Sequence, residues 1–326
     1  MDFEKLSKKI KPEIGDILFA RYASIGSVRH INTTRNFIAS YSCAILKSSS
    51  SFDSQYLFFL LQSDKIQNQL KQSINTGSQG NIGIESLKRL AIYFPEKEEQ
   101  TQIGEYFGEL DSLIGLHQRK HDKLVTLKKA MLEKMFPQPG ANTPEIRFKG
   151  FSDEWAERTL HHLADRYDNL RIPISARNRV PGITPYYGAN GIQDYVQGYT
   201  HDGEFILVAE DGANDVKDYP VQYVLGKVWV NNHAHVLQGK NNLAETRFLK
   251  YAFSQINVEA LLVGGGRSKL NAEAMMQIEF FVPQGIEEQQ KIGSYFRTLD
   301  ELIAKHATQL QKLQQIKSAC LEKMFV

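Results

Sequence analysis

The feature that most constrains this chain is an internal repeat. Residues 98–136 and 287–325 are identical at 21 of 39 positions when one is shifted by 189 residues onto the other. A weaker match at a shift of 188 aligns GDILFAR (15–21) with GEFILVAE (203–210). A repeat of this kind has to be found first, because missing it leads to the wrong fold. The chain is therefore a tandem duplication in which a variable domain precedes each copy of one repeated segment.

Both repeated segments are predicted to be long helices. Their apolar residues recur at steps of three and four, neither contains proline, and Pro95 and Pro283 stand just before them. Such spacing, held over five turns or more, is typical of a coiled-coil seam, in which we place His117 and His306 as packing residues. At 1.5 Å per residue, a helix of this length measures about 60 Å.

The apolar stripe is wider than a two-stranded seam requires. This excess predicts that the helices pack on each other and also offer apolar surface to another protein; the alternative is that the stripes only hold two domains together. The residues assigned to this partner-binding surface are Tyr106, Phe107, Leu132, Phe136, Tyr295, Phe296, Leu321 and Phe325.

The variable domains are expected to be small and mixed. Residues 140–286 contain short β-branched and aromatic runs, such as FILVA (205–209) and VQYVL (221–225), separated by Gly, Asn and Asp. This pattern indicates several strands and an α+β fold. The predicted order is a first domain over 1–97, a helix over 98–139, a second domain over 140–286 and a helix over 287–326.

The two copies differ in length. The second begins near PEIRFKGFSDEW (144–155), and the matching start of the first would fall before residue 1. The first domain is therefore expected to be shortened, with strands and part of its binding surface missing. Whether Met1 is the native start is left open.

Composition narrows the class of protein. The chain is 42% hydrophobic, which suffices for sizeable cores, and its net charge of +2 names no partner. Residues 1–97 carry 13 basic and 8 acidic side chains, whereas residues 145–286 carry 14 basic and 17 acidic side chains. The excess of acidic residues in the second domain argues against indiscriminate binding to phosphates there. Two cysteines exclude a disulfide scaffold, and the start of the chain lacks the apolar core of a signal peptide. A cytoplasmic protein without membrane association is expected.

Two histidines lie where a strand should be apolar, in Asn231–His235. His233 and His235 would project from one face and could bind a metal, but no third ligand has a distinctive spacing. We favour buried, hydrogen-bonded residues that fix a strand end, with contact to a polar ligand as the alternative. No metal site is predicted.

A glycine-rich loop follows, Gly264–Lys269, and it does not fit the P-loop pattern. Its Arg and Lys suit a nucleic-acid backbone or groove, whereas the matching loop of the first copy, residues 77–81, carries Gln and Asn, which suit adenine. A solvated flexible loop is the alternative. Arg171, Arg177 and Arg179 form a second, weaker basic cluster.

Catalytic motifs are absent from the sequence. There is no Walker A motif, no G-x-S-x-G, no H-E-x-x-H and no Asn/Asp-Pro-Pro-aromatic motif of the amino-methyltransferases. These absences favour a recognition protein that is not itself an enzyme and needs no cofactor.

At this point the sequence resembles the specificity (S) subunits of type I restriction-modification systems. The resemblance covers nearly the whole chain and rests on the following segments: GDILFARYASIG (15–26), the proline–EEQ–helix blocks (95–114 and 283–303), PEIRFKGFSDEW (144–155), PYYGANGIQDYV (185–196) and GKVWVNNHAHVL (226–237). It implies two mixed α/β target recognition domains that alternate with two long helices packed as an antiparallel coiled coil.

The resemblance also implies a function. Each recognition domain would read one half of a split site on double-stranded DNA, while the helices set the spacing and dock two modification (methyltransferase) subunits. Restriction subunits would join them in a complex for DNA methylation and defence against foreign DNA, and catalysis would belong to those partners.

Contacts in this family vary with the target, so residues are assigned by type. The DNA-binding residues expected in the first domain are Arg21, Tyr22, Ser78, Gln79 and Asn81, and those in the second are Tyr187, Asn190, Asn214, Arg267, Ser268 and Lys269. The alternative is a truncated scaffold, or a recombination-reservoir copy of the gene, that binds modification subunits without reading DNA. A split subunit, completed by another fragment, also stays open.

Overall fold

The computed structural model describes residues 11–35, 37–74, 80–264 and 268–325. The chain forms two compact units, the first from two separate segments and the second from one continuous stretch. The first unit comprises the described residues of Met1–His121 and Lys305–Val326, and the second comprises Asp122–Ala304. Each unit therefore contains one variable domain and a stretch of both repeated segments.

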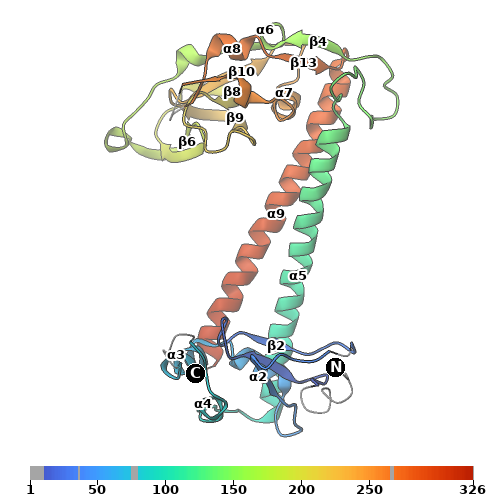
Figure 1. The fold of residues 1–326 in the computed structure, drawn as a ribbon. Coiled ribbons are helices and arrows are strands. Elements are labelled where there is room, and N and C mark those ends of the chain that lie inside the picture. The colour runs from blue at the N-terminus through green and yellow to red at the C-terminus, as the bar shows by residue number, and fades with distance from the viewer. Residues whose placement is uncertain (1–10, 36, 75–79, 265–267, 326) are drawn as a thin grey trace. The chain divides into compact units, whose positions relative to one another are not determined.

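The first unit has a three-stranded antiparallel sheet in the order β2-β1-β3. Its elements are β1 (Ile17–Ala20), β2 (Val28–His30), β3 (Cys43–Leu46), α2 (Ser54–Leu60), α3 (Asp64–Gln72) and α4 (Ile84–Lys88). Figure 1 labels β2 and the helices α2, α3 and α4 of this unit. Ile17 and Phe19 alternate along β1 and face the core, each 1% exposed. Helix α2 begins after Asp53, whose carboxylate accepts a hydrogen bond from the Tyr56 amide at 2.8 Å.

The second unit is built on a six-stranded sheet in the order β5-β10-β8-β9-β6-β7, in which only the β6–β9 pairing is parallel. Its strands in this sheet are β5 (Ala164–Arg166), β6 (Pro181–Gly188), β7 (Gly191–Val196), β8 (His201–Ala209), β9 (Val221–Val230) and β10 (Ala234–Gly239). Helix α7 (Thr246–Phe253) packs against β8, β9 and β10. Residues 205–209 lie within β8 and are all buried, as expected for a central strand.

Shorter elements complete the second unit. Strands β4 (Ala156–Thr159) and β13 (Glu279–Val282) form one antiparallel pair, and β11 (Leu262–Val263) and β12 (Lys269–Leu270) form another. The remaining short helices are α6 (Leu160–Leu163), η1 (Asp168–Leu170), η2 (Ala176–Asn178), η3 (Val258–Leu261) and α8 (Ala272–Met276).

The repeated segments form the helices α5 (Lys97–Lys134) and α9 (Ile286–Met324). In the first unit Asp111 pairs with Lys317 at 2.7 Å, and the Nδ1 atoms of His117 and His306 lie 2.9 Å apart. In the second unit Lys128 pairs with Asp300 at 2.6 Å. Later residues of α5 contact earlier residues of α9, so the two helices run antiparallel. This confirms the α+β fold with an antiparallel coiled coil.

The duplication is visible in the hydrogen bonds of both units. The Gln100 side chain accepts from the Asp53 amide and donates to the Pro95 carbonyl, both at 2.9 Å. Gln289 does the same with the Glu245 amide and with the carbonyl of the proline before α9, both at 3.0 Å. The start of each long helix is thus held to the helix that follows the sheet, α2 or α7, in the same way.

One prediction for the helices needs correction. The side chains of Phe107 and Phe296 are 0% exposed, and those of Phe136 and Phe325 are 3% and 4% exposed. All four belong to the hydrophobic cores of their units, so they cannot form a docking surface while the chain stays folded. Tyr106, Leu132, Tyr295 and Leu321 are only partly covered, and their assignment to a partner surface stays a prediction.

No helix within the described residues is long and apolar enough to span a bilayer.

Candidate nucleic-acid interface

Two asparagines of the second unit meet at one edge of its sheet. Asn190 lies in the turn between β6 and β7, and its side-chain amide donates to the Gly212 carbonyl at 2.8 Å. Its Oδ1 accepts from the Asn214 amide at 2.9 Å. The hairpin turn is therefore tied to the loop that follows β8. Both Asn190 and Asn214 are exposed, which leaves polar atoms for a ligand.

The β11–β12 hairpin joins the same edge. Asp211 and Lys269 form an antiparallel bridge, and the Leu270 amide donates to the Glu210 carbonyl at 2.7 Å. The Lys269 ammonium lies 2.6 Å from the Glu210 carboxylate, with about half of its side chain exposed. Ser268 precedes it and is partly exposed. The structure thus brings Asn190, Asn214 and Lys269 to adjoining loops.

Tyr187 lies beside this edge but is half-buried. Its ring packs against the apolar cluster between β8, β9 and β10, and its carbonyl accepts from the Asn231 amide at 3.1 Å. Burial, together with the neighbouring Tyr195, raises the pKa of the Tyr187 hydroxyl, so the ring stays neutral. Tyr187 therefore supports the hairpin turn at least as much as it faces a ligand.

A buried ion network lies beneath the exposed loops. The Arg171 guanidinium contacts the Glu210 carboxylate at 2.6 Å, and the His235 ring contacts Asp168 at 2.7 Å. Burial alone would raise the pKa of Glu210, but the hydrogen bonds from Lys269 and Arg171 outweigh it and lower that pKa. Glu210 therefore stays ionised and holds two cations near the surface.

His235 is a structural residue, which confirms the favoured interpretation for it. Its side chain is 1% exposed, with Nδ1 against Asp168 and Nε2 at 3.0 Å from the Leu270 carbonyl. Asp168, Glu210 and His235 lie close enough to hold an ion, but Glu210 is already paired with Arg171 and Lys269, and the Asp168 carboxylate with Arg171 and the Val236 amide. We therefore assign the cluster to ion pairing.

The first unit places its assigned residues at the matching position. Tyr22 and Asn81 form an antiparallel bridge that corresponds to the bridge between Asp211 and Lys269. The Arg21 Nε donates to the Ile82 carbonyl at 3.0 Å, and its guanidinium lies 5.6 Å from the Tyr22 ring centre. Arg21, Tyr22 and Asn81 thus lie together, and each is partly exposed.

Three assigned residues, Ser78, Gln79 and Arg267, lie outside the described residues.

Of the second basic cluster, two arginines have structural roles. Arg171 belongs to the ion network, and Arg179 lies 4.2 Å from the Tyr186 ring centre and 3.3 Å from Asp194. Arg177 is exposed.

The role of Glu210 was missed in the sequence. The carbonyl of Arg21 accepts from the Ile82 amide as that of Glu210 accepts from the Leu270 amide, so Arg21 and Glu210 occupy equivalent positions. One domain thus has a cation where the other has an anion. Aligning GDILFAR with GEFILVAE one residue out of register would have shown this pair.

Comparison with known proteins agrees with the architecture. A sequence profile of the type I restriction modification DNA specificity domain matches residues 1–126 and 152–315. A putative type I restriction enzyme specificity subunit from Haemophilus influenzae is 43% identical over 139 residues, which are 43% of this chain and 35% of that protein. The putative MjaX specificity subunit of Methanocaldococcus jannaschii is 23% identical over 330 residues, 93% of this chain and 76% of that one.

A solved structure has the same fold. The crystal structure of a type I restriction-modification S subunit from M. genitalium superposes with a TM-score of 0.69 at 19% identity. The match covers 98% of this chain and 85% of that one. Since the two profile matches together cover most of the sequence, this chain belongs to the family of type I restriction-modification specificity subunits.

Proposed function

We propose that this chain is the DNA-reading subunit of a type I restriction-modification complex. The observation that carries the proposal is the matched polar edge of the two units. Residues 21, 22 and 81 in one unit, and residues 210, 211 and 269 in the other, lie at equivalent positions of the same fold. Two equivalent edges with different side chains suit a protein that reads two different half-sites.

The long helices would dock the modification subunits. Buried aromatic residues are excluded from this role, but apolar side chains remain exposed along both helices. They are Leu113, Leu116 and Ile316 in the first unit and Val125, Leu127 and Leu302 in the second. Apolar side chains on a solvated helix surface are typical of sites that a partner covers. We assign docking to these residues together with Tyr106, Leu132, Tyr295 and Leu321.

The proposed assembly contains double-stranded DNA, two modification subunits and restriction subunits, and it would act in the cytoplasm. Methyl transfer and cleavage would be carried out by the partners, because the chain carries no recognisable catalytic motif. Its own contribution would be to choose the DNA sequence and to fix the spacing of the half-sites.

The test is co-expression with the cognate modification subunit, followed by sequencing of methylated bases in the host DNA. A bipartite motif supports reading by both domains, and a single half-site or its palindromic doubling assigns reading to the second domain. A stable complex without methylation would contradict DNA reading.

Variants sharpen this test at the second unit. We expect Asn190→Ala with Lys269→Ala to relax the preference at one half-site and leave the other unchanged. Leu113→Asp with Leu116→Asp should instead abolish co-purification of the modification subunit. The exposed Lys227, on β9, supplies the matched control Lys227→Ala, which should alter neither readout.

A second function, a scaffold that binds modification subunits without reading DNA, is favoured by one observation. The sheet of the first unit has three strands, whereas the main sheet of the second has six. The scaffold predicts a complex whose affinity for DNA does not depend on sequence.

A further inference from the structure

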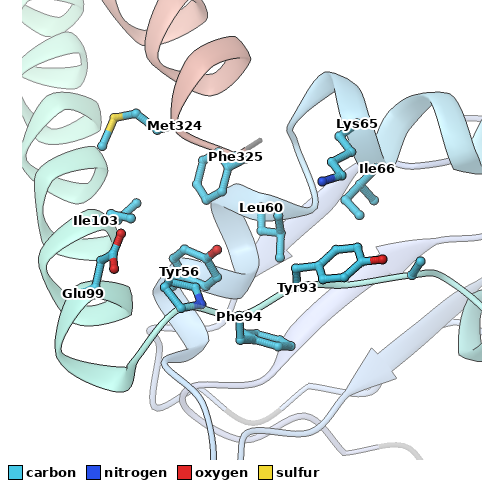
Figure 2. Close-up of a pocket in the computed structure, with 12 residues that line it drawn as sticks. Tyr56, Leu60, Lys65, Ile66, Tyr93, Phe94, Glu99, Ile103, Met324 and Phe325 are labelled. Atoms are coloured by element: carbon cyan, nitrogen blue, oxygen red, sulfur yellow. The ribbon is translucent and has the colours of Figure 1, made fainter.

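The first unit contains an open cavity of about 240 Å³ at the junction of its helices. Figure 2 shows it between Tyr56 and Leu60 of α2, Ile103 of α5, Phe325 after α9 and the extended residues 91–94. Apolar and aromatic side chains form most of its wall, and Lys65 and Glu99 add one charge of each sign. A cavity that combines apolar side chains with a few charged groups is typical of a binding site.

The second unit contains the same arrangement, but there it is filled. Phe136 is the counterpart of Phe325 by the repeat, and Phe248 is the counterpart of Tyr56 because each donates its amide to the acidic residue that caps its helix. The rings of Phe136 and Phe248 stack on each other, and Trp155 packs edge-on against both, with ring centres 5.8 Å from Phe136 and 5.9 Å from Phe248. Trp155 is only 3% exposed. The indole thus occupies the place that is open beside Tyr56 and Phe325 in the first unit.

The strand that follows Trp155 has no counterpart among the described residues of the first unit either. In the second unit β4 pairs antiparallel with β13, and the Leu160 amide donates to the Ile278 carbonyl at 2.8 Å. Residues 91–94 correspond to β13 but form no strand, and Tyr93 is 71% exposed. In an extended segment, the backbone N–H and C=O groups of alternate residues point to the same side. Those of Ile92 and Phe94 therefore point to the side that β4 occupies in the second unit.

The opposite edge of this segment is already engaged. The Gln69 side chain accepts from the Ala91 amide at 3.0 Å and donates to the Ala91 carbonyl at 3.1 Å. Within the described residues, the backbone groups of Ile92 and Phe94 make no hydrogen bond. One edge is therefore ready to accept a strand.

A charged contact shows the same difference. In the second unit Arg147 contacts Glu288 through two hydrogen bonds of 2.6 and 2.7 Å, and Glu288 is 2% exposed. Its counterpart Glu99 is exposed and forms no ion pair with any described residue. Likewise Phe148 packs edge-on against Tyr295 at 6.0 Å, whereas the counterpart Tyr106 is 42% exposed.

We propose that this cavity and the edge at 91–94 bind, from another polypeptide, an extended segment like residues 147–159 of this chain. The segment would place an arginine against Glu99 and a tryptophan against Tyr56 and Phe325, and would then pair as a strand with Ile92 and Phe94. The sequence has only two tryptophans, Trp155 and Trp229, and both lie in the second unit. Because neither tryptophan of the sequence lies in the first unit, we assign the indole to a second polypeptide.

The direct test is binding of a labelled synthetic peptide that spans residues 145–161, titrated with the full chain and followed by fluorescence anisotropy. We expect saturable binding with one peptide per chain. A peptide with Trp155→Ala should bind at least about tenfold more weakly, because an indole would no longer be buried. Neither DNA nor a modification subunit is needed, so failure here is distinct from failure of the proposed function.

Matched variants of the chain locate the peptide. Ile92→Pro removes an amide from the edge that faces the proposed strand, whereas Tyr93→Pro removes one from the other side. We expect the first to abolish binding and the second to retain it, with circular dichroism to check that both fold. A second pair of variants tests the charged contact without changing the backbone. The variant Glu99→Arg of the chain should bind the peptide more weakly, and a peptide with Arg147→Glu should restore binding to that variant.

Three results would overturn the proposal. The first is absence of saturable binding, and the second is binding that survives both Trp155→Ala in the peptide and Ile92→Pro in the chain. The third is a dimer of the chain, measured by light scattering, that is lost with Ile92→Pro, because it would assign the edge to a second copy.

Discussion

The two units share the same core arrangement but differ in the segments that cover it. Both have a central strand flanked by two antiparallel neighbours, a capped helix, and a glutamine that ties the long helix to it. The second unit adds a covering segment, Arg147–Thr159, that fills its cavity, pairs with β13 and neutralises Glu288. Within the described residues, the equivalent surfaces of the first unit are open. The two copies thus share their helices and core arrangement but differ in what covers them.

The largest effect is expected from Trp155→Ala. Removing a large buried aromatic side chain from a packed core costs about 3–5 kcal/mol of unfolding free energy. The loss should appear in the second unit alone, measured by urea denaturation with hydrogen exchange to separate the two units. The matched control is Tyr93→Ala, at an exposed position of the first unit. An equal loss of hydrogen-exchange protection in both units would contradict the expected difference between them.

Next in size is the contrast between Glu288→Gln and Glu99→Gln. The first change leaves Arg147 with a buried, uncompensated charge, and such losses amount to about 3–5 kcal/mol. Exposed carboxylates contribute about 0–1 kcal/mol, so the second change should be nearly neutral. Thermal denaturation of both variants measures the difference. Similar midpoints for the two would show that the Arg147 pair contributes little.

A smaller and equal effect is expected at two matched glycines. A Cβ on Gly104 would lie 3.0 Å from the Tyr56 amide nitrogen, and one on Gly293 would lie 3.1 Å from the Phe248 amide nitrogen. Each alanine variant should lose about 1–3 kcal/mol, because the long helix must move away from the capped helix. Gly115→Ala is the control, since its nearest neighbour is the flexible end of Arg119. Loss in only one unit would show that the two helix contacts differ.

The smallest effect is a difference in acid sensitivity. Glu210 has a lowered pKa in the folded chain, so it stabilises the second unit above the pKa of an unfolded glutamate, about 4.3. That contribution is lost as the pH falls through the lower folded value. In the first unit the equivalent residue is Arg21, so no carboxylate lies at this position. Glu210→Gln should flatten the pH dependence of denaturation below pH 5, and an unchanged profile would contradict this account.

Much of the fold could be predicted from the sequence, because the repeat and the spacing of apolar residues are local patterns that can be read directly. The 189-residue repeat, the 3/4 spacing of the helices and the prolines before them gave the long helices and the two domains. The glycines and asparagine of residues 188–191 are typical of a turn, and Asn190 lies in the turn between β6 and β7. His235 was predicted to be structural because it interrupts an apolar run.

Other features were decided by tertiary contacts. Apolar spacing shows that Phe107 and Phe296 face inward but cannot distinguish a coiled-coil surface from a domain core, and both side chains proved to be in cores. The pairing of Glu210 with Arg171 joins residues 39 positions apart, and no local pattern encodes it.

The sequence by itself determined that the chain is duplicated, that each copy ends in a long helix and that polar loops follow the strands. Local spacing suffices for these features, because helix and strand periods and turn residues act over a few positions. Only the tertiary structure decided which aromatic residues are covered and that residues 91–94 have an open edge. Burial and strand pairing depend on which distant segments meet, and local sequence patterns do not encode those meetings.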